Sequence, residues 1–300
     1  DWSSDVCSSD LRSTGRHMIS TVLEHASVGG TLTALQQQGW EVDLLDIQRD
    51  GTIDLEQLGD LLRKDTILVS VCAVDSELGT VQPIRQITEI LKDFPNCRLH
   101  VDATQAIGKT ELVMDGVDTM SIAPHKFYGL NGSGLLLKKS SVIIEPQIHG
   151  GSSTTLYRSG TPALALAVSI EKALQLTLTQ QEERIRCVRQ LNEYLKTALL
   201  HYPSVRINSP EGAVPHILNL SVQGLKGTVF QRVLSERGVC VSVKSACSAE
   251  GTPSKAVFAV SGDRKNALSS WRVSLSHLTT REELDEFLQV FDQCYKELVP

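Results

Sequence analysis

The sequence predicts an α/β fold with a mainly parallel mixed sheet, followed by a smaller α+β domain at the C-terminus. Two observations support this prediction. From His17 onward, short apolar runs alternate with amphipathic segments, as they do where helices connect the strands of a parallel sheet. The chain of 300 residues is also 41% hydrophobic and 21% charged, a balance typical of a globular protein with a substantial core.

The N-terminal half supplies the elements of the sheet. Asp54 can cap a helix by accepting hydrogen bonds from first-turn amides, and leucines recur behind it at helical spacing. Pro83 is tolerated in the first turn of a second helix, which Pro95 ends. Five apolar segments are predicted as strands: 41–47, 66–74, 98–103, 117–123 and 134–138. The turn-rich residues 124–133 then form a loop at the edge of the sheet.

The C-terminal half predicts the smaller domain. A helix with one apolar face comes first. Strands are predicted at residues 239–243 and 269–274. A final helix starts at the capping box that Thr280 forms with Glu283, because each side chain can bond the backbone amide of the other.

The chain divides into three predicted regions. Residues 1–11 are rich in Ser and Asp without hydrophobic periodicity, so they resemble a translated sequencing adapter, with a natural disordered tail as the alternative. We therefore expect residues 1–16 to be an artefactual or disordered leader. A boundary near residue 180, within residues 176–183, separates a large domain (17–180) from a small one (181–300).

Composition restricts the possible functions. The formal net charge of -6 and the lack of a basic cluster argue against direct binding of nucleic acid. No apolar run approaches the roughly 20 residues of a membrane span, and no secretory signal opens the chain. The seven cysteines form no C-x-x-C pair, so we expect reduced thiols and a cytoplasmic location. The histidines show no metal-ligand spacing, so no metal site is expected.

Two clusters in the first domain carry reactive groups. VDATQ at 101–105 ends a strand in Asp102, and in open α/β sheets ligands bind at the carboxyl ends of strands. APHKFYG at 123–129 places Lys126 beside His125 in a loop, where burial beside cationic or apolar groups lowers the pKa of an amine nucleophile. The alternatives are a carboxylate that caps the next turn and a solvated surface lysine.

Two further clusters lie in the second domain. SACSAEGTPS at 245–254 places Cys247 among small residues, where a thiol is accessible and free to move. SSWRVS at 269–274 places Arg272 inside a strand, and its planar guanidinium suits a substrate carboxylate. Packing is the alternative role for any single cysteine, because free cysteine is among the most buried residue types.

Six motifs occur together in a family-like order. They are EHASV around His25, VDATQ, PHKFYG, YRSGTP at 157–162, KSACS and SSWRVSLSHLTT. Over residues 17–300 the chain resembles the NifS/IscS-type cysteine desulfurases of the class V aminotransferase family, most closely the versions from Gram-positive, lactic-type bacteria. The resemblance implies PLP fold type I and dependence on pyridoxal 5'-phosphate (PLP). It also implies that L-cysteine is converted to L-alanine with an enzyme persulfide.

The resemblance implies roles around the cofactor ring. Lys126 would form the Schiff base with PLP and move the α-proton of the substrate. Asp102 would pair with the pyridinium nitrogen, which preserves the ring as an electron sink. His25 would stack on the ring face, and Gln105 would bond the phenolic oxygen.

The same resemblance implies roles at the phosphate, the substrate and the partners. His125 would contact the phosphate, and Thr161 would reach the phosphate of the partner subunit's cofactor, which implies a homodimer. Arg272 and Ser76 would bind the substrate carboxylate. Cys247 would attack the substrate sulfur as a thiolate. The sulfur would then pass to an acceptor protein, either an iron–sulfur scaffold or a tRNA-thiolating enzyme.

Some residues depart from the family pattern. The N-terminal portion with its phosphate-binding Ala-Thr-Glu turn is absent, Ala123 stands at a usual Ser, and Ser76 stands at a usual Asn. Lys244 precedes Cys247 where many relatives are Gly-rich, and its charge could lower the thiol pKa or simply be solvated. Each lost charge-assisted hydrogen bond is worth roughly 1.5–3 kcal/mol. The sequence therefore predicts weak PLP retention for a chain of this length, which could leave the fragment inactive.

Alternative functions remain open. A selenocysteine lyase can use a cysteine in the same loop, whereas an aminotransferase needs no thiol and is disfavoured by Cys247. A non-catalytic scaffold that binds sulfur-acceptor proteins is disfavoured by the presence of both Lys126 and Cys247. Retention of PLP and release of sulfide from cysteine distinguish these alternatives.

Overall fold

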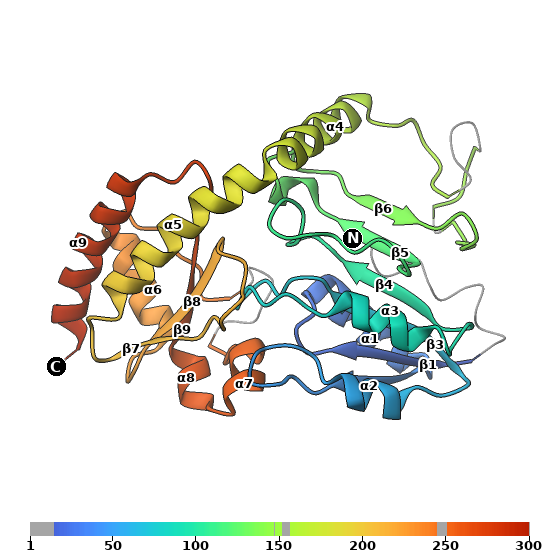
Figure 1. The fold of residues 1–300 in the computed structure, drawn as a ribbon, viewed down its shortest axis with the longest axis horizontal. Helices are drawn as coiled ribbons and strands as arrows, with labels where there is room; N and C mark the ends of the chain where they lie inside the picture. The colour runs from blue at the N-terminus through green and yellow to red at the C-terminus, as the bar shows by residue number, and fades with distance from the viewer. Residues whose placement is uncertain (1–14, 147, 152–156, 245–250, 300) are drawn as a thin grey trace. The chain divides into compact units, whose positions relative to one another are not determined.

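The computed structural model describes residues 15–146, 148–151, 157–244 and 251–299. Most of the predicted leader, residues 1–16, therefore lies outside the described residues. The chain divides into two compact units (Figure 1). The first unit comprises Asp1–Asp46, Ile53–Val74 and Gln82–Thr179, and the second comprises Ile47–Thr52, Asp75–Val81 and Gln180–Pro300.

The first unit is built on a six-stranded sheet with the strand order β2-β1-β3-β4-β5-β6. The strands are β1 (His17–Thr21), β2 (Glu41–Leu45), β3 (Thr66–Cys72), β4 (Arg98–Asp102), β5 (Thr119–Ile122) and β6 (Leu135–Lys138). Strands β1 to β5 pair in parallel, and β6 pairs antiparallel with β5. The predicted mainly parallel mixed sheet is confirmed.

Helices connect the first four strands in chain order, as the alternating pattern predicted, and a 3-10 turn and a further helix follow later in the chain. They are α1 (Ala26–Gln37), α2 (Leu55–Leu61), α3 (Ile84–Leu91), the 3-10 turn η1 (Pro124–Lys126) and α4 (Leu164–Thr179). Asp54 caps α2 by accepting hydrogen bonds from the amides of Glu56 and Gln57, both at 3.0 Å. Pro83 is the N-cap of α3, one position before the predicted first turn.

The core of the first unit fixes α1 against the sheet. Val28, Leu32 and Leu35 of α1 are buried in one cluster with Met18 of β1 and Leu68 of β3. Burying a side chain of this size contributes roughly 1.5–3 kcal/mol. The packing sets the position of the junction between β1 and α1, where the predicted site residue His25 lies.

The second unit contains a three-stranded antiparallel sheet in the order β7-β8-β9. Its strands are β7 (Val205–Ile207), β8 (Ile217–Val222) and β9 (Ser270–Ser274). Its helices are α5 (Gln181–Leu199), α6 (Gly227–Glu236), α7 (Lys255–Ser261), α8 (Arg264–Ser269) and α9 (Arg281–Leu298). The capping box of Thr280 and Glu283 at the start of α9 is confirmed.

An aromatic cluster forms the core of the second unit. Trp271 of β9 is fully buried and stacks on Phe230 of α6 with ring centroids 5.5 Å apart. Phe291 of α9 packs against both rings. Cys294 is buried in the same cluster and therefore has a packing role, as free cysteines often do. Trp271 therefore anchors the strand that carries Arg272.

The strand predicted at residues 239–243 is wrong. This segment forms a single bridge, between Ser242 and Arg272. Val239, Val241 and Val243 still pack against the core of the second unit, so the alternation of the sequence is real. Alternation places every second side chain against the core. A strand must also form backbone hydrogen bonds with an adjacent strand over several residues.

Two further findings concern binding of membranes and metals. Among the helices of the described residues, none combines the length and the hydropathy of a bilayer-spanning segment. The His, Cys, Asp and Glu side chains of those same residues form no group of three that could hold a metal ion.

Candidate active site

The carboxyl edge of the parallel sheet gathers four predicted site residues in the first unit. His25 follows β1 and is the N-cap of α1. Asp102 is the last residue of β4, and Gln105 lies in the turn behind it. Lys126 ends η1, which follows β5 directly. Parallel strands point the same way, so their carboxyl ends meet at one edge, where open α/β sheets bind ligands.

The Asp102 carboxylate is buried and held by its own turn. Its side chain is 9% exposed, and Oδ1 accepts a hydrogen bond from the amide of Thr104 at 2.9 Å. In the sheet Asp102 pairs with Cys72 of β3 and with Ser121 of β5. The acid therefore has a fixed position at the centre of the edge.

The His25 ring is fixed by the turn that it caps. Nδ1 accepts a hydrogen bond from the amide of Ser27 at 3.2 Å and lies 2.9 Å from the Ser27 hydroxyl oxygen. Accepting from an amide requires an unprotonated Nδ1, so the neutral ring carries its proton on Nε2. The hydrogen bond from the Ser27 backbone therefore fixes the orientation of the imidazole ring without a ligand.

Lys126 lies on an exposed part of a rigid turn. His125 and Lys126 are both exposed, whereas the neighbouring Phe127 is buried. Partial burial and the charge of Lys126 lower the pKa of His125, so the imidazole is mainly neutral at neutral pH. Tyr128 has a left-handed φ of 74°, an uncommon conformation for a bulky residue. The turn thus presents an amine and a neutral imidazole side by side.

Gln105 bonds a neighbouring lysine, and Thr161 lies just before α4. The Gln105 side-chain oxygen accepts a hydrogen bond from the ammonium of Lys109 at 2.6 Å. Thr161 is exposed and precedes α4 by three residues. Neither residue contacts another predicted site residue through a bond seen in the described part of the chain.

The hydroxyl of Ser121 is already engaged, so it does not compensate for Ala123. It lies 3.3 Å from Nε2 of His100, whose Nδ1 lies 2.9 Å from the hydroxyl of Thr119. Burial lowers the pKa of His100 to about 4, against the opposing effect of Asp102. His100 is therefore a neutral imidazole that links two hydroxyls across β4 and β5.

The second unit holds the two predicted substrate-binding residues together. Arg272 donates from Nη1 to the carbonyl oxygen of Ser76 at 2.6 Å and from Nε to the hydroxyl of Ser274 at 3.1 Å. Burial lowers the pKa of Arg272, while the carboxylates of Glu77 and Asp75 act to raise it. Arg272 bonds the backbone carbonyl of Ser76, so this contact does not depend on the serine side chain.

Asn219 and Ser254 hold the same loop from other elements of the second unit. Asn219 of β8 donates to the carbonyl oxygen of Glu77 at 3.1 Å. The hydroxyl of Ser254, the N-cap of α7, donates to the Glu77 carboxylate at 2.5 Å. Residues 75–81 are thus tied to β8, β9 and α7.

Cys247, the predicted nucleophile, lies outside the described residues. Lys244 and Thr252 flank the segment that contains it. The Lys244 ammonium donates to the Thr252 carbonyl at 2.9 Å and to the Thr252 hydroxyl at 2.6 Å. This cation is therefore engaged at the base of the cysteine loop.

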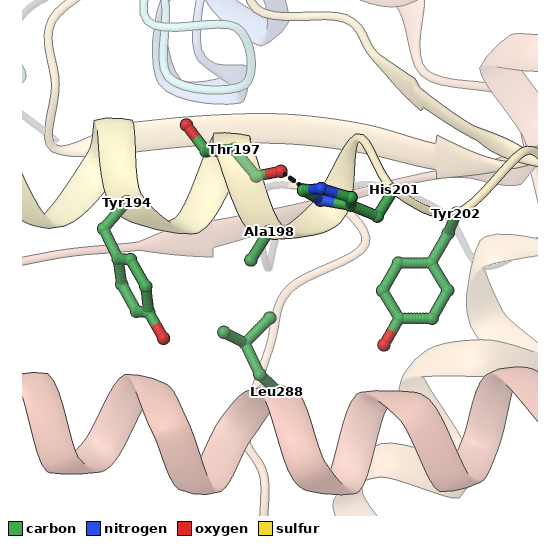
Figure 2. Close-up of a pocket in the computed structure, with 6 residues that line it drawn as sticks. All are labelled: Tyr194, Thr197, Ala198, His201, Tyr202 and Leu288. Carbon is green, nitrogen blue, oxygen red and sulfur yellow. Dashed lines mark hydrogen bonds between the residues drawn. The ribbon is translucent and has the colours of Figure 1, made fainter.

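A surface pocket of about 450 Å³ lies between α5 and α9 in the second unit (Figure 2). The Tyr194 hydroxyl donates to Asp285, and Nδ1 of His201 bonds the carbonyl oxygen of Thr197 at 2.8 Å. The pocket is lined by Tyr194, Thr197, Ala198, His201, Tyr202 and Leu288. It contains none of the predicted site residues.

Glu24 is a site residue that the sequence analysis did not single out. Its carboxyl group is buried at the same edge, and burial raises its pKa to about 8, with the charge of Asp102 as the next cause. The residue stands in the EHASV motif, directly before His25. An acid between a buried strand and a helix N-terminus was the signal that could have identified it.

Comparisons with known proteins give consistent matches. A family model described as aminotransferase class-V matches residues 6–287. The chain is 37% identical over 291 residues to the NifS/IcsS protein homolog of Lactobacillus delbrueckii subsp. bulgaricus, a match that covers 95% of the chain and 76% of the relative. It is 33% identical over 293 residues to the cysteine desulfurase IscS of Dictyoglomus turgidum, covering 96% and 74%.

A solved structure agrees with these sequence matches. A protein described as NifS-like superposes on the chain with a TM-score of 0.88 at 31% sequence identity, and the match covers 95% of this chain and 76% of that one. Its similarity extends over both units. The matches agree with the resemblance that the sequence motifs predicted, including the relative from a lactic bacterium.

Proposed function

The chain belongs to the class V aminotransferase family, and we propose that it is a PLP-dependent cysteine desulfurase that takes sulfur from L-cysteine and releases L-alanine. The observation that carries the proposal is the alignment of His25, Asp102 and Lys126 along the carboxyl edge of one parallel sheet. The name of the relative from Dictyoglomus turgidum supplies the reaction.

The residues at this edge fit the ring of PLP. A buried carboxylate at Asp102 suits a cationic ring nitrogen, and the exposed amine of Lys126 suits an aldehyde. A buried carboxyl oxygen of Glu24 finds no partner among the described residues, as expected beside a polar ligand. When bound, PLP would supply an electron sink for the α-carbon of the substrate.

Lys126 would hold the cofactor and then move a proton. Its exposure leaves the amine free to reach a ligand and afterwards the α-carbon of the substrate. His25 would pack its ring on the cofactor, because the bond from the Ser27 amide holds the imidazole in one orientation. Gln105 would bond the phenolic oxygen of the ring.

The phosphate has fewer ligands than the family pattern provides. His125 would donate from its neutral ring, and Thr161 would reach the phosphate bound by the partner subunit of a homodimer. Ala123 offers no hydroxyl, and the hydroxyl of Ser121 is engaged by His100. Weak retention of PLP therefore stays a prediction.

Arg272 would bind the carboxylate of L-cysteine. Its guanidinium is oriented by the Ser76 carbonyl and the Ser274 hydroxyl, and a planar guanidinium suits a carboxylate. Ser76 would contribute through the loop that it shapes. The cytoplasmic location and the transfer of sulfur to an acceptor protein also stay predictions.

Cys247 would be the sulfur nucleophile. Its thiolate would attack the substrate sulfur, the bond between that sulfur and the substrate β-carbon would break, and the electron pair would stay with the carbon. The carbon would take up a proton, giving alanine, and the sulfur would stay on Cys247 as a persulfide. The atoms and charges balance without an external oxidant.

Cysteine substitution tests this function. Changing Cys247→Ala should abolish sulfide release from L-cysteine and leave the absorbance of bound PLP unchanged, because the thiol makes no contribution to holding the ring. Cys240→Ala is the matched control, since Cys240 is exposed in the same unit and carries no proposed role. Desulfuration that survives Cys247→Ala would show that another group attacks the sulfur. A protein that binds no added PLP would refute the enzyme proposal.

A further inference from the structure

Glu24 reaches across the end of β3 toward Asp102. Its Oε1 accepts a hydrogen bond from the amide of Cys72 at 2.8 Å and another from the hydroxyl of Thr21 at 3.0 Å. Cys72 is the register partner of Asp102 in the sheet. The Glu24 carboxyl therefore lies at the carboxyl edge beside the acid that is proposed to hold the ring nitrogen.

The other carboxyl oxygen of Glu24 is buried without a partner. Oε2 has no hydrogen bond within the described residues and is closed off from solvent. A buried anionic oxygen without a donor costs more free energy than a buried neutral carboxyl oxygen in the same place. The geometry alone favours a neutral carboxylic acid in the absence of a ligand.

The charges around Glu24 favour the same state. Burial raises its pKa to about 8, and repulsion from Asp102 of β4 adds to this effect. The amide and thiol of Cys72 and the hydroxyl of Thr21 act in the opposite direction but do not offset it. Asp102 and the Cys72 thiol are the titratable groups that act on Glu24 from the neighbouring strands.

We infer that Glu24 is a positioning residue for Asp102: it keeps its proton while no cation faces Asp102, and it releases that proton to solvent when a cationic ring nitrogen binds there. This inference rests on the proposed function, because PLP would supply the nitrogen. A cation within a few ångströms favours the charged form of a carboxyl group. Binding of PLP is then coupled to the loss of one proton.

The coupling gives Glu24 a functional role beyond packing. While Glu24 is neutral, it does not repel Asp102 as a second carboxylate would before the cofactor arrives. Once the proton has left, the negative charge of Glu24 would add to that of Asp102 and would favour the protonated form of the ring nitrogen. If PLP binding releases a proton, then a higher pH must strengthen PLP binding. The affinity for PLP should therefore rise by up to about tenfold per pH unit in the pH range where Glu24 is protonated in the free protein.

The test compares the intact protein with Glu24→Gln and with Glu145→Gln, an exposed control on the same unit. The affinity for PLP is measured by absorbance titration between about pH 6 and pH 8. The unchanged protein and Glu145→Gln should gain affinity more steeply with pH than Glu24→Gln, by up to about tenfold per unit. Equal pH dependence in all three proteins overturns the role of Glu24 but leaves the proposed function intact. A failure of every protein to bind PLP overturns both.

A second measurement tests the same inference on the unchanged protein, in case the Glu24→Gln variant does not fold. Infrared difference spectra of the unchanged protein, taken on addition of PLP at neutral pH, report protonated carboxyl groups directly. Loss of a carboxylic acid C=O band supports proton release. A spectrum in which this band is unchanged contradicts it.

Discussion

At the scale of single residues, burial decides which ionisable groups are charged. His100 is a neutral imidazole because burial lowers its pKa to about 4. Asp75 and Glu24 show the opposite shift, since burial raises the pKa of each acid. The states of the two acids do not follow from the residue type, whose ordinary pKa would make both fully ionised at neutral pH.

Asp75 should make the stability of the protein depend on pH. Burial raises its pKa from 3.8 to about 7, despite the amides of Glu77 and Leu78 that bond its carboxyl group. Between these values the unfolded state binds fewer protons than the folded state, so the free energy of unfolding falls as pH rises from about 4 to 7. The loss is at most roughly 4 kcal/mol at 1.36 kcal/mol per pKa unit.

The Asp75→Asn variant removes this titration. Its free energy of unfolding, measured by urea denaturation from about pH 4 to 7, should decline less than that of the unchanged protein. Asp93→Asn, at an exposed position, is the control and should follow the unchanged protein. Parallel pH profiles for all three proteins would show that Asp75 ionises normally in the fold.

At the scale of elements, the ends of helices are fixed by local chemistry. Asp54 caps α2, and Thr280 with Glu283 caps α9, both as the sequence predicted. These contacts span two or three residues, so they depend on no distant part of the fold. The strand predicted at 239–243 failed for the opposite reason, because a ladder needs a neighbouring strand from elsewhere in the chain.

Removal of one cap gives a measurable loss. Asp54→Ala should lower the free energy of unfolding by about 1 kcal/mol, because two first-turn amides of α2 lose their acceptor. The change should appear as a lower urea midpoint with an unchanged m-value. Asp60→Ala, on the exposed side of the same helix, should have a smaller effect. A cap variant as stable as the unchanged protein would mean that the helix end is held by packing alone.

At the scale of the whole molecule, the proposed homodimer requires a surface that a second copy can cover. Helix α4 exposes Leu164 by 73% and Val168 by 54%, one helical turn apart. Exposed apolar patches of this kind are typical of protein–protein contact sites. Thr161, proposed to reach the partner's cofactor phosphate, precedes this helix by three residues. These observations support α4 as part of the dimer contact.

Charged substitutions on α4 test the dimer. The double variant Leu164→Glu with Val168→Glu should shift the protein from dimer to monomer in sedimentation velocity, because burying two carboxylates in an apolar contact is costly. Leu200→Glu is the control, since Leu200 is 62% exposed in the second unit. A dimer that persists in the double variant would place the contact elsewhere, and a monomeric unchanged protein would refute the homodimer.

The sequence by itself determined the mainly parallel sheet, the helix caps and the family. Each depends on short-range patterns, such as apolar alternation, a capping acid or a motif like VDATQ that ends a strand in Asp102. The same patterns placed Lys126 after a predicted strand, whereas β1, the strand that precedes His25, was not predicted. Local chemistry and chain order are sufficient for these features because neighbours in sequence make the contacts.

Only the tertiary structure decided the electrostatics of the candidate site. The EHASV motif does not reveal that Glu24 bonds the amide of Cys72, 48 residues away, or that it lies beside Asp102. Nor does SSWRVS reveal that Arg272 holds the backbone of Ser76 across 196 residues. Burial and charge depend on which distant segments meet. A pKa is therefore a property of the packed fold rather than of the motif that carries the residue.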